Sequence, residues 1–128
     1  MYPKELKYSE AHIWLKLEGD RTARIGITDY YQRQLNRVVF IELPEEGAEI
    51  KKAEPFGSIE SSKTINDLLS PVSGRVNDVN HLLSTNPALT NSDPYGAGWI
   101  AVLKISNLRE LETLMQAEEY DALVSKPE

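Results

Sequence analysis

The chain has 128 residues, 41% hydrophobic and 27% charged, so it is long enough for one domain, residues 1–128, with a proper core. A formal net charge of −6 disfavours nucleic acid as a partner, and the lack of long apolar runs disfavours a membrane span or a secretory signal. The absence of cysteine excludes disulfides, zinc–cysteine sites and cysteine nucleophiles. We therefore expect a cytoplasmic protein, or one of an organelle matrix in a eukaryote.

The first part of the sequence predicts short strands separated by turn residues. Thr28 is a common N-cap residue, and it predicts a short helix over residues 29–35. Turns are expected at 18–20 and 44–47. The strands expected here lie at 6–8, 13–17, 22–27 and 38–43.

The second part predicts further strands and a closing helix. Asn80 is expected to cap a helical turn that ends at 86–87, and 92–98 has turn composition. Asn107 and Glu110 have the spacing of a capping box, and the residues after Asn107 predict an amphipathic C-terminal helix that packs on the core. The apolar positions at helical spacing are Leu108, Leu111, Leu114 and Met115, and the expected strands lie at 54–60, 64–70, 74–79 and 99–105.

Lys63 lies in a polar stretch, residues 61–64, between two of these strands. Two alternating runs joined by a short polar segment predict a β-hairpin, with Lys63 at or near its tip. A lysine at such a tip is ordinarily a solvated charge, so its neighbours decide whether it has a role.

The stretch from Glu60 to Gly74, Glu-Ser-Ser-Lys-Thr-Ile-Asn-Asp-Leu-Leu-Ser-Pro-Val-Ser-Gly, resembles the lipoyl-attachment hairpin of the glycine cleavage system H proteins. The resemblance implies that Lys63 carries lipoate in amide linkage. It also implies that the protein is a carrier and not an enzyme. A lipoate ligase or lipoyltransferase would be one of its partners.

The resemblance extends over nearly the whole chain, in the order and at the spacing of the family. It implies a mostly β fold, the lipoyl-domain-like barrel-sandwich hybrid of two small antiparallel sheets, with short helices and an exposed lysine hairpin. The matching blocks are Leu6-Lys7-Tyr8, His12, Trp14, Glu18-Gly19, residues 25–29, residues 38–44, Gly47, Asn91, residues 93–96 and Gly98-Trp99.

Three residues match positions that lipoyl-attaching enzymes recognise in the family. Glu60 lies three residues before Lys63, Gly47 sixteen before it, and Gly74 eleven after it. A simpler interpretation is that Glu60 is an ordinary strand charge and that both glycines relieve strain in turns. The two interpretations are compatible, because an enzyme that reads a folded hairpin reads the shape that the turns create.

Other modified or unmodified lysines fit this sequence less well. Biotin carriers normally have methionines beside the lysine, where this chain has Ser62 and Thr64. Lipoyl domains of 2-oxo acid dehydrogenases usually carry Asp-Lys-Ala and are smaller. An unmodified relative of the fold and an enzyme in its own right remain alternatives. His12 and His81 show no metal-ligand pattern, and His12 beside Trp14 suits a packed or hydrogen-bonded histidine, so we expect no metal site.

The sequence departs from the family around the expected cleft for the loaded arm. Family members usually present Ser-His-Glu-Trp on the first strand, whereas this chain has Ala11-His12-Ile13-Trp14, although Asp67 of the hairpin remains. An ammonium in a cleft without a carboxylate partner is unfavourable.

Further departures lie beyond this strand. The usual histidine of the first helix aligns with Gln34. Asn36-Arg37 stands where the family has Gly and an acid, and Arg75 also replaces an acid. The residues expected around the arm are thus His12, Ile13, Asp67, Arg37 and Arg75.

These departures leave two pathways open. Arginines suit an anionic cargo, which favours the H-protein-like lipoate-binding proteins of oxidative sulfur metabolism, with a heterodisulfide-reductase-like complex as partner. The alternative is drift within glycine cleavage. In that pathway the arm carries an aminomethyl group between glycine decarboxylase (P), aminomethyltransferase (T) and dihydrolipoyl dehydrogenase (L).

Overall fold

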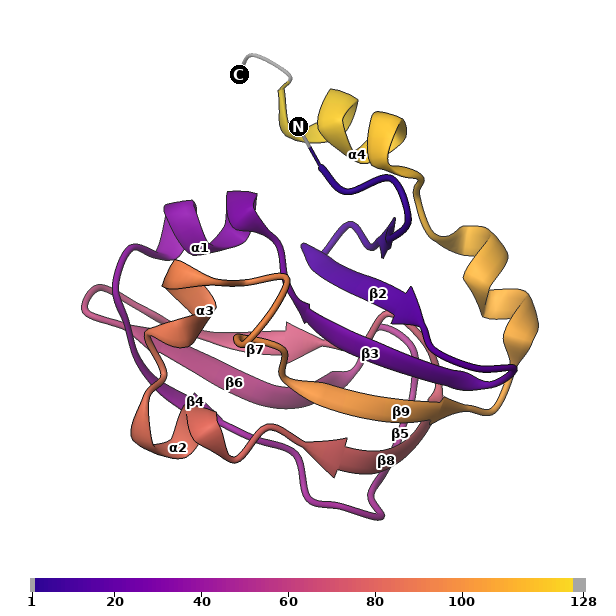
Figure 1. Ribbon diagram of the computed structural model, residues 1–128, viewed down its shortest axis with the longest axis horizontal. Helices are drawn as coiled ribbons and strands as arrows, with labels where there is room; N and C mark the ends of the chain where they lie inside the picture. Colours follow the sequence, from indigo (N-terminus) through magenta and orange to yellow (C-terminus); the bar gives the residue numbers. More distant parts are fainter. Residues whose placement is uncertain (1, 126–128) are drawn as a thin grey trace.

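The computed structural model describes residues 2–125, which form two antiparallel β-sheets packed against each other (Figure 1). The strands are β1 Lys7–Tyr8, β2 Ile13–Leu17, β3 Thr22–Ile27, β4 Val38–Glu42, β5 Glu49–Ile50, β6 Pro55–Ser61, β7 Ile65–Leu69, β8 Gly74–Val79 and β9 Ala101–Ile105. The larger sheet has the order β1-β2-β3-β9-β8-β5, and the smaller sheet has the order β4-β6-β7. The expected mostly β fold with two antiparallel sheets is confirmed.

The main core lies between the two sheets. Ile25 and Leu103 contribute from the larger sheet, Ile59 and Leu68 from the smaller one, and none of the four is more than 1% exposed. Successive side chains of a strand point to opposite faces, so each sheet turns one apolar face toward this core.

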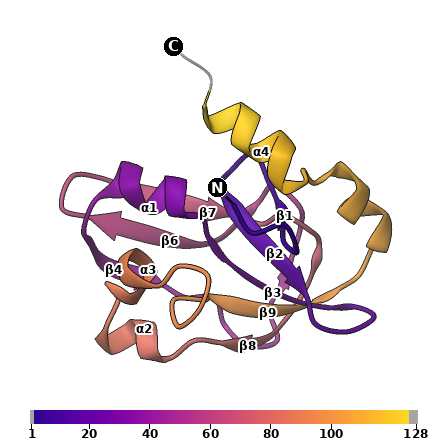
Figure 2. The same ribbon diagram turned by 45° about the horizontal axis from the view of Figure 1, so that its top comes forward.

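The helices are short and lie at the ends of the strands. They are α1 Asp29–Leu35, α2 Leu82–Thr85, α3 Leu89–Ser92 and α4 Ala117–Val124, with a 3₁₀ helix, η1, over Leu108–Thr113. The predicted helix over 29–35 is confirmed, and the Thr28 hydroxyl caps it by accepting a hydrogen bond from the Tyr31 N–H. Figure 2 shows α1, α2 and α3 on the same side as the loop between β6 and β7. No helix within residues 2–125 is long and apolar enough to cross a bilayer.

The C-terminal segment differs from the prediction of one amphipathic helix starting at Asn107. It forms η1, then an extended stretch, then α4. Glu110 does not complete a capping box, because its carboxylate accepts hydrogen bonds from the Ser73 N–H and hydroxyl at 2.6 and 3.0 Å. Met115 pairs with Tyr8 as a β-bridge, which interrupts the helix. The capping box forms later, between Gln116 and Glu119.

A second, aromatic cluster joins α4 to the N-terminal strands. Tyr8, Trp14 and Tyr120 are almost fully buried in it. The rings of Tyr8 and Tyr120 stack with centroids 4.8 Å apart, and the Trp14 Nε1–H donates to the Pro94 carbonyl at 2.9 Å. This cluster fixes α4 beside the start of β2.

Candidate functional site

Lys63 lies in the loop of the hairpin formed by β6 and β7, where it is exposed to solvent. The strands pair in register up to Glu60 opposite Ile65, so only a few residues form the loop. The predicted hairpin with Lys63 at its tip is therefore what the structure contains. Figure 1 shows this loop at one extreme of the molecule, beyond α1.

Ser61 organises the backbone of this loop. Its side-chain oxygen accepts hydrogen bonds from the backbone N–H groups of Lys63 and Thr64, each at 3.2 Å. The Ser61 N–H donates to the Thr64 carbonyl at 2.8 Å. Ser61 is only 5% exposed, so its hydroxyl is held in place by packing. A short loop with its N–H groups satisfied presents Lys63 from a defined backbone position.

The Lys63 side chain is available for acylation of its amine. Within residues 2–125, Lys63 Nζ takes part in no ion pair or hydrogen bond, so no protein group competes for it. An exposed primary amine on a fixed loop is the group that amide linkage to a carboxylic acid such as lipoate requires. The chemistry and accessibility of this residue therefore fit the cofactor that the sequence predicted.

Glu60 lies on the solvent-facing side of the smaller sheet, next to the loop. It stands directly between Phe40 of β4 and Ile65 of β7, which are 55% and 69% exposed. An enzyme that approaches Lys63 meets this carboxylate and the two apolar side chains on one surface. The position suits the predicted role of Glu60 in recognition by a ligase.

Gly47 and Gly74 lie on the side of the molecule opposite the lysine loop. Both are near the start of β8, where Gly74 pairs with Ile105 and the Gly47 N–H donates to the Val76 carbonyl. Figure 1 shows the start of β8 on the side opposite the β6–β7 loop. Gly47 has φ +89°, and a Cβ on Gly74 would collide with the carbonyl oxygen of Lys104. These glycines therefore have clear structural roles, and their predicted role in recognition by a ligase stays a prediction.

His12 packs against Tyr31 of α1. The His12 ring lies 5.6 Å from the Tyr31 ring, centroid to centroid. Burial raises the pKa of the Tyr31 phenol, and the negative charge of Asp67 raises it further. The His12 Nδ1 lies 2.7 Å from the Tyr120 hydroxyl, and burial lowers the pKa of His12. His12 is thus a packed, hydrogen-bonded histidine.

Ile13 differs from the prediction that it lines an arm cleft. It exposes no surface and belongs to the core between the sheets. Ala11, two residues before it, lines a surface hollow whose other lining residues include Lys52 and Leu114. An isoleucine at this position is therefore explained by burial in the core alone.

The two arginines expected around the arm lie in different places. Arg37 lies directly before β4, whose first residue, Val38, pairs with Ser61 beside the lysine loop. Arg75 is the second residue of β8, opposite Glu49 and Lys104, and it lines a separate hollow. The two arginines therefore do not line one hollow, and their predicted place around the arm stays a prediction.

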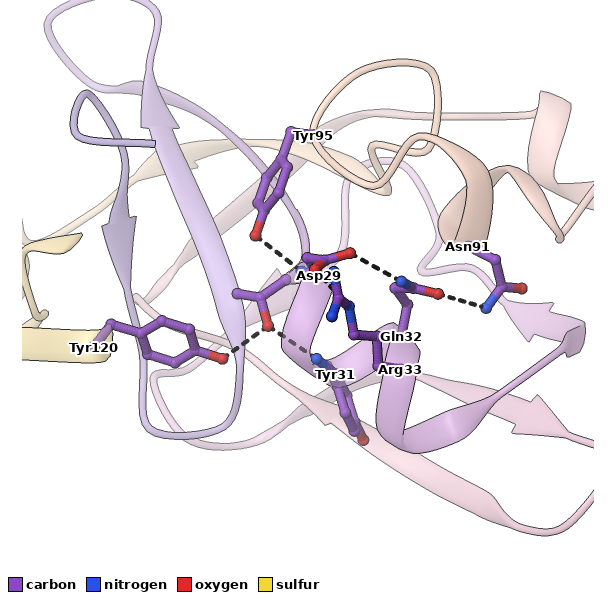
Figure 3. Close-up of polar contacts among 8 residues, drawn as sticks. Asp29, Tyr31, Gln32, Arg33, Asn91, Tyr95 and Tyr120 are labelled. Atoms are coloured by element: carbon purple, nitrogen blue, oxygen red, sulfur yellow. Dashed lines mark hydrogen bonds and ion pairs between the residues drawn. The ribbon is translucent and has the colours of Figure 1, made fainter. Parts of the chain in front are cut away.

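Asn91 of α3 ties the helices to β4 and so to the hairpin. Its side-chain oxygen accepts from the Val38 N–H at 2.9 Å, and its amide nitrogen donates to the Asn36 carbonyl at 2.7 Å and to Gln32 Oε1 at 3.1 Å. Figure 3 shows this chain of contacts continuing from Gln32 to Asp29, which also pairs with Arg33. Val38 in turn pairs with Ser61.

Sequence reasoning did not assign roles to Ser61, Tyr31 or Asn91. Ser61 was visible as a serine at the end of a strand before a short polar loop, a position where hydroxyls often bond to the backbone. Tyr31 and Asn91 gave no comparable local signal, because their contacts join segments far apart in the sequence.

Comparisons with known proteins agree on one family. The family described as Glycine cleavage H-protein matches residues 6–127. The chain is 50% identical over 124 residues to the glycine cleavage system H protein of Halalkalibacterium halodurans, covering 97% of this chain and 96% of that one. It is 48% identical to the H protein of Bacillus subtilis, covering 97% of each. A crystal structure of the H protein from Mycobacterium marinum has a TM-score of 0.86 at 33% identity, covering 95% of this chain and 98% of that one.

Proposed function

Because the chain belongs to the glycine cleavage H-protein family, whose members carry lipoate covalently on a lysine, we propose that it is a lipoyl carrier with Lys63 as the attachment residue. The observation that carries the proposal is the exposed Lys63 amine on a hairpin loop whose backbone is fixed by Ser61. The lipoyl group supplies a dithiolane that accepts and passes on electrons and small groups. The protein holds the attachment point and presents it to enzymes, and it is a carrier and not a catalyst.

We propose further that the pathway is glycine cleavage, with the P, T and L proteins and a lipoate ligase as partners. The relatives named above are glycine cleavage system H proteins, and they give no support to oxidative sulfur metabolism or a heterodisulfide-reductase-like complex. The residues that favoured an anionic cargo also support it less than the sequence suggested, since Ile13 is a core residue and Arg75 lies away from the loop. The relatives are bacterial, which favours the cytoplasm as the compartment.

The attachment is tested by incubating the protein with a lipoate ligase, ATP and lipoate, and measuring intact mass. One lipoyl adduct is expected, and peptide mapping should place it on Lys63. Lys63→Ala should abolish the adduct and leave the thermal unfolding midpoint unchanged, because an exposed loop side chain buries little surface. An adduct on Lys51, Lys52 or any other lysine would refute the assignment.

The pathway is tested separately by reconstituting glycine decarboxylation with purified P, T and L proteins. The lipoylated protein should support the reaction at a rate comparable to the Bacillus subtilis H protein at an equal degree of lipoylation. A protein that is lipoylated on Lys63 but does not support this reaction remains a lipoyl carrier and is excluded from glycine cleavage.

A further inference from the structure

A basic hollow lies beside the lysine loop, between the C-terminal half of α1 and α3. Its volume is about 590 Å³. The residues around it include two arginines, three side-chain amides and a hydroxyl, and no carboxylate: Arg33, Arg37, Gln32, Asn36, Asn91 and Ser92. In a chain with 20 acidic and 14 basic residues, a hollow of this composition is a local exception to the acidic surface. Its chemistry favours a negatively charged occupant.

Two of the side-chain amides that line this hollow, those of Gln32 and Asn91, are hydrogen-bonded to other parts of the fold. The Asn91 side chain bonds to Val38, Asn36 and Gln32, and the Gln32 amide nitrogen donates to Asp29 Oδ1 at 2.9 Å (Figure 3). These contacts occupy both amides and leave the guanidinium groups as the main free donors. A guanidinium presents several N–H donors in one plane, which matches the two oxygens of a carboxylate.

The two arginines differ in how much of their charge is available. Arg33 Nε lies 2.8 Å from Asp29 Oδ2, so its charge is partly neutralised by the fold. Arg37 is exposed and, within residues 2–125, makes neither an ion pair nor a side-chain hydrogen bond. Arg37 is therefore the side chain on which an incoming carboxylate would depend most.

The hollow lies close enough to Lys63 to be covered by an enzyme that holds this lysine. Arg37 directly precedes Val38, and Val38 pairs with Ser61, two residues before Lys63. Both ribbon views place α1, α3 and the β6–β7 loop on the same side (Figures 1 and 2). A specific protein interface covers about 800 Å² and 20–30 residues on each partner. An interface centred on the Lys63 loop therefore extends over Arg37.

We propose that this hollow docks an acidic side chain of the enzyme that attaches lipoate to Lys63, with Arg37 as its principal contact. The inference rests on the proposed function, because it assumes that Lys63 is the residue modified. The attaching enzyme must hold the bare lysine in its active site and so must cover the surface around the loop. Enzymes that work on the far end of a long arm are under no such constraint.

A protein carboxylate fits this surface better than a larger polyanion. Across the hairpin, the outer face of the smaller sheet carries Glu60, and Glu42 and Asp67 flank Ser58 in the neighbouring row. These carboxylates repel an extended polyanion, whereas a protein surface can place one acidic side chain at the hollow and cations opposite these acids.

The test is the steady-state kinetics of lipoylation by a purified lipoate ligase, with the unmodified protein as varied substrate and intact mass as readout. Arg37→Glu should raise KM at least tenfold with kcat changed less than twofold. Added salt should reduce the difference in KM between this variant and the unaltered protein. Arg37→Ala should raise KM by a smaller factor. Arg109→Glu is the matched control, because Arg109 is exposed on η1 and gives the same charge change away from the hollow.

Equal KM values for Arg37→Glu and Arg109→Glu would overturn the proposal, as would a rise in KM that is unchanged by salt. Thermal unfolding of both variants checks that each remains folded. Peptide mapping of the product distinguishes failure of the docking site from failure of the proposed function. If Lys63 is modified but Arg37→Glu has no effect, only the docking site is refuted. If the modified residue is not Lys63, the proposed function itself fails.

Discussion

The Nδ1 atom of His12 lies 2.7 Å from the hydroxyl oxygen of Tyr120, and this contact joins the start of β2 to the C-terminal helix. The same hydroxyl lies 2.7 Å from Thr28 Oγ1, which caps α1. One buried tyrosine therefore holds together three segments that are distant in sequence. His12 adopts φ +69°, a left-handed conformation that is uncommon for histidine, so the surrounding contacts maintain a mildly strained backbone.

The first prediction concerns the pH dependence of stability. Burial lowers the pKa of His12, so the unfolded chain binds a proton more readily than the folded protein does. The stability contributed by neutral His12 is fully present above the ordinary histidine pKa of about 6.5 and is lost as the pH falls through the lower pKa of the folded state. Asparagine tolerates the left-handed backbone. In His12→Asn, the free energy of unfolding should therefore decrease less between about pH 7 and pH 5 than it does in the unaltered protein.

Urea unfolding at several pH values measures this effect. His81→Asn is the matched control, because His81 is the other histidine of the chain and is exposed. The interpretation is wrong if the two variants lose equal amounts of pH dependence.

The second prediction concerns the Tyr120 hydroxyl. Tyr120→Phe keeps the stacked ring but removes the hydrogen-bond partner of the half-buried His12 and the buried Thr28. The free energy of unfolding should fall by about 1–3 kcal/mol. Tyr30→Phe should change it by less than about 0.5 kcal/mol, because no hydrogen bond of the Tyr30 hydroxyl is present within residues 2–125. Equal effects in chemical denaturation would mean that the hydroxyl of Tyr120 contributes nothing.

The local part of this architecture could be predicted from the sequence. Alternating runs around a polar loop predicted the Lys63 hairpin, and Thr28 predicted the start of α1, because each depends on residues close together in the chain. The two-residue strand β5 was missed, since so short a segment has no periodicity of its own.

Features set by distant partners could not be predicted in this way. Glu110 looked like part of a capping box, but it bonds to Ser73, and Met115 pairs with Tyr8. Alignment of Arg37 and Arg75 with family acids likewise gave no information about their separation in space. The helix prediction failed at Glu110 and Met115 because their partners are distant in sequence and only the folded chain brings them together.

The third prediction uses Ile13, which is fully buried. Ile13→Glu places a carboxylate in the core, where burial raises its pKa, and should lower the free energy of unfolding by about 3–5 kcal/mol at pH 7. The loss should be smaller at pH 5, because the protonated form is less costly to bury. Ile13→Val should reduce stability by only about 1 kcal/mol. A glutamate variant that is as stable as the valine variant at pH 7 would indicate that this part of the core opens to water.

The fourth prediction separates structural from recognition roles of the glycines. Gly74→Ala should destabilise the protein by about 1–3 kcal/mol, since the new methyl group meets the backbone carbonyl of Lys104. Gly47→Ala should cost about 1–2 kcal/mol through its positive φ. Because both lie away from Lys63, the initial rate of lipoylation per folded molecule should be unchanged. A slower rate for fully folded protein would instead mean that the ligase contacts these positions directly.

The fifth prediction concerns Ser61 as the residue that positions Lys63. Ser61→Ala removes the oxygen that accepts the N–H groups of Lys63 and Thr64, so the loop loses its defined backbone while the strands remain paired. Stability should fall by only about 1 kcal/mol. The amides of Lys63 and Thr64 should exchange with solvent faster, and kcat/KM for lipoylation should fall several-fold. Ser61→Thr, which keeps a hydroxyl, should restore much of both.

Ser62→Ala provides the control, because Ser62 is exposed in the same loop and its side chain makes no hydrogen bond within residues 2–125. Amide exchange measured by NMR and lipoylation measured by intact mass report on the loop independently of global unfolding. If Ser61→Ala lowers stability but leaves both readouts equal to those of Ser62→Ala, then Ser61 only packs against its neighbours. Ser61→Ala and Ser62→Ala remove the same group from adjacent residues. If only Ser61→Ala changes both readouts and Ser61→Thr restores them, the Ser61 hydroxyl sets the position from which Lys63 is presented.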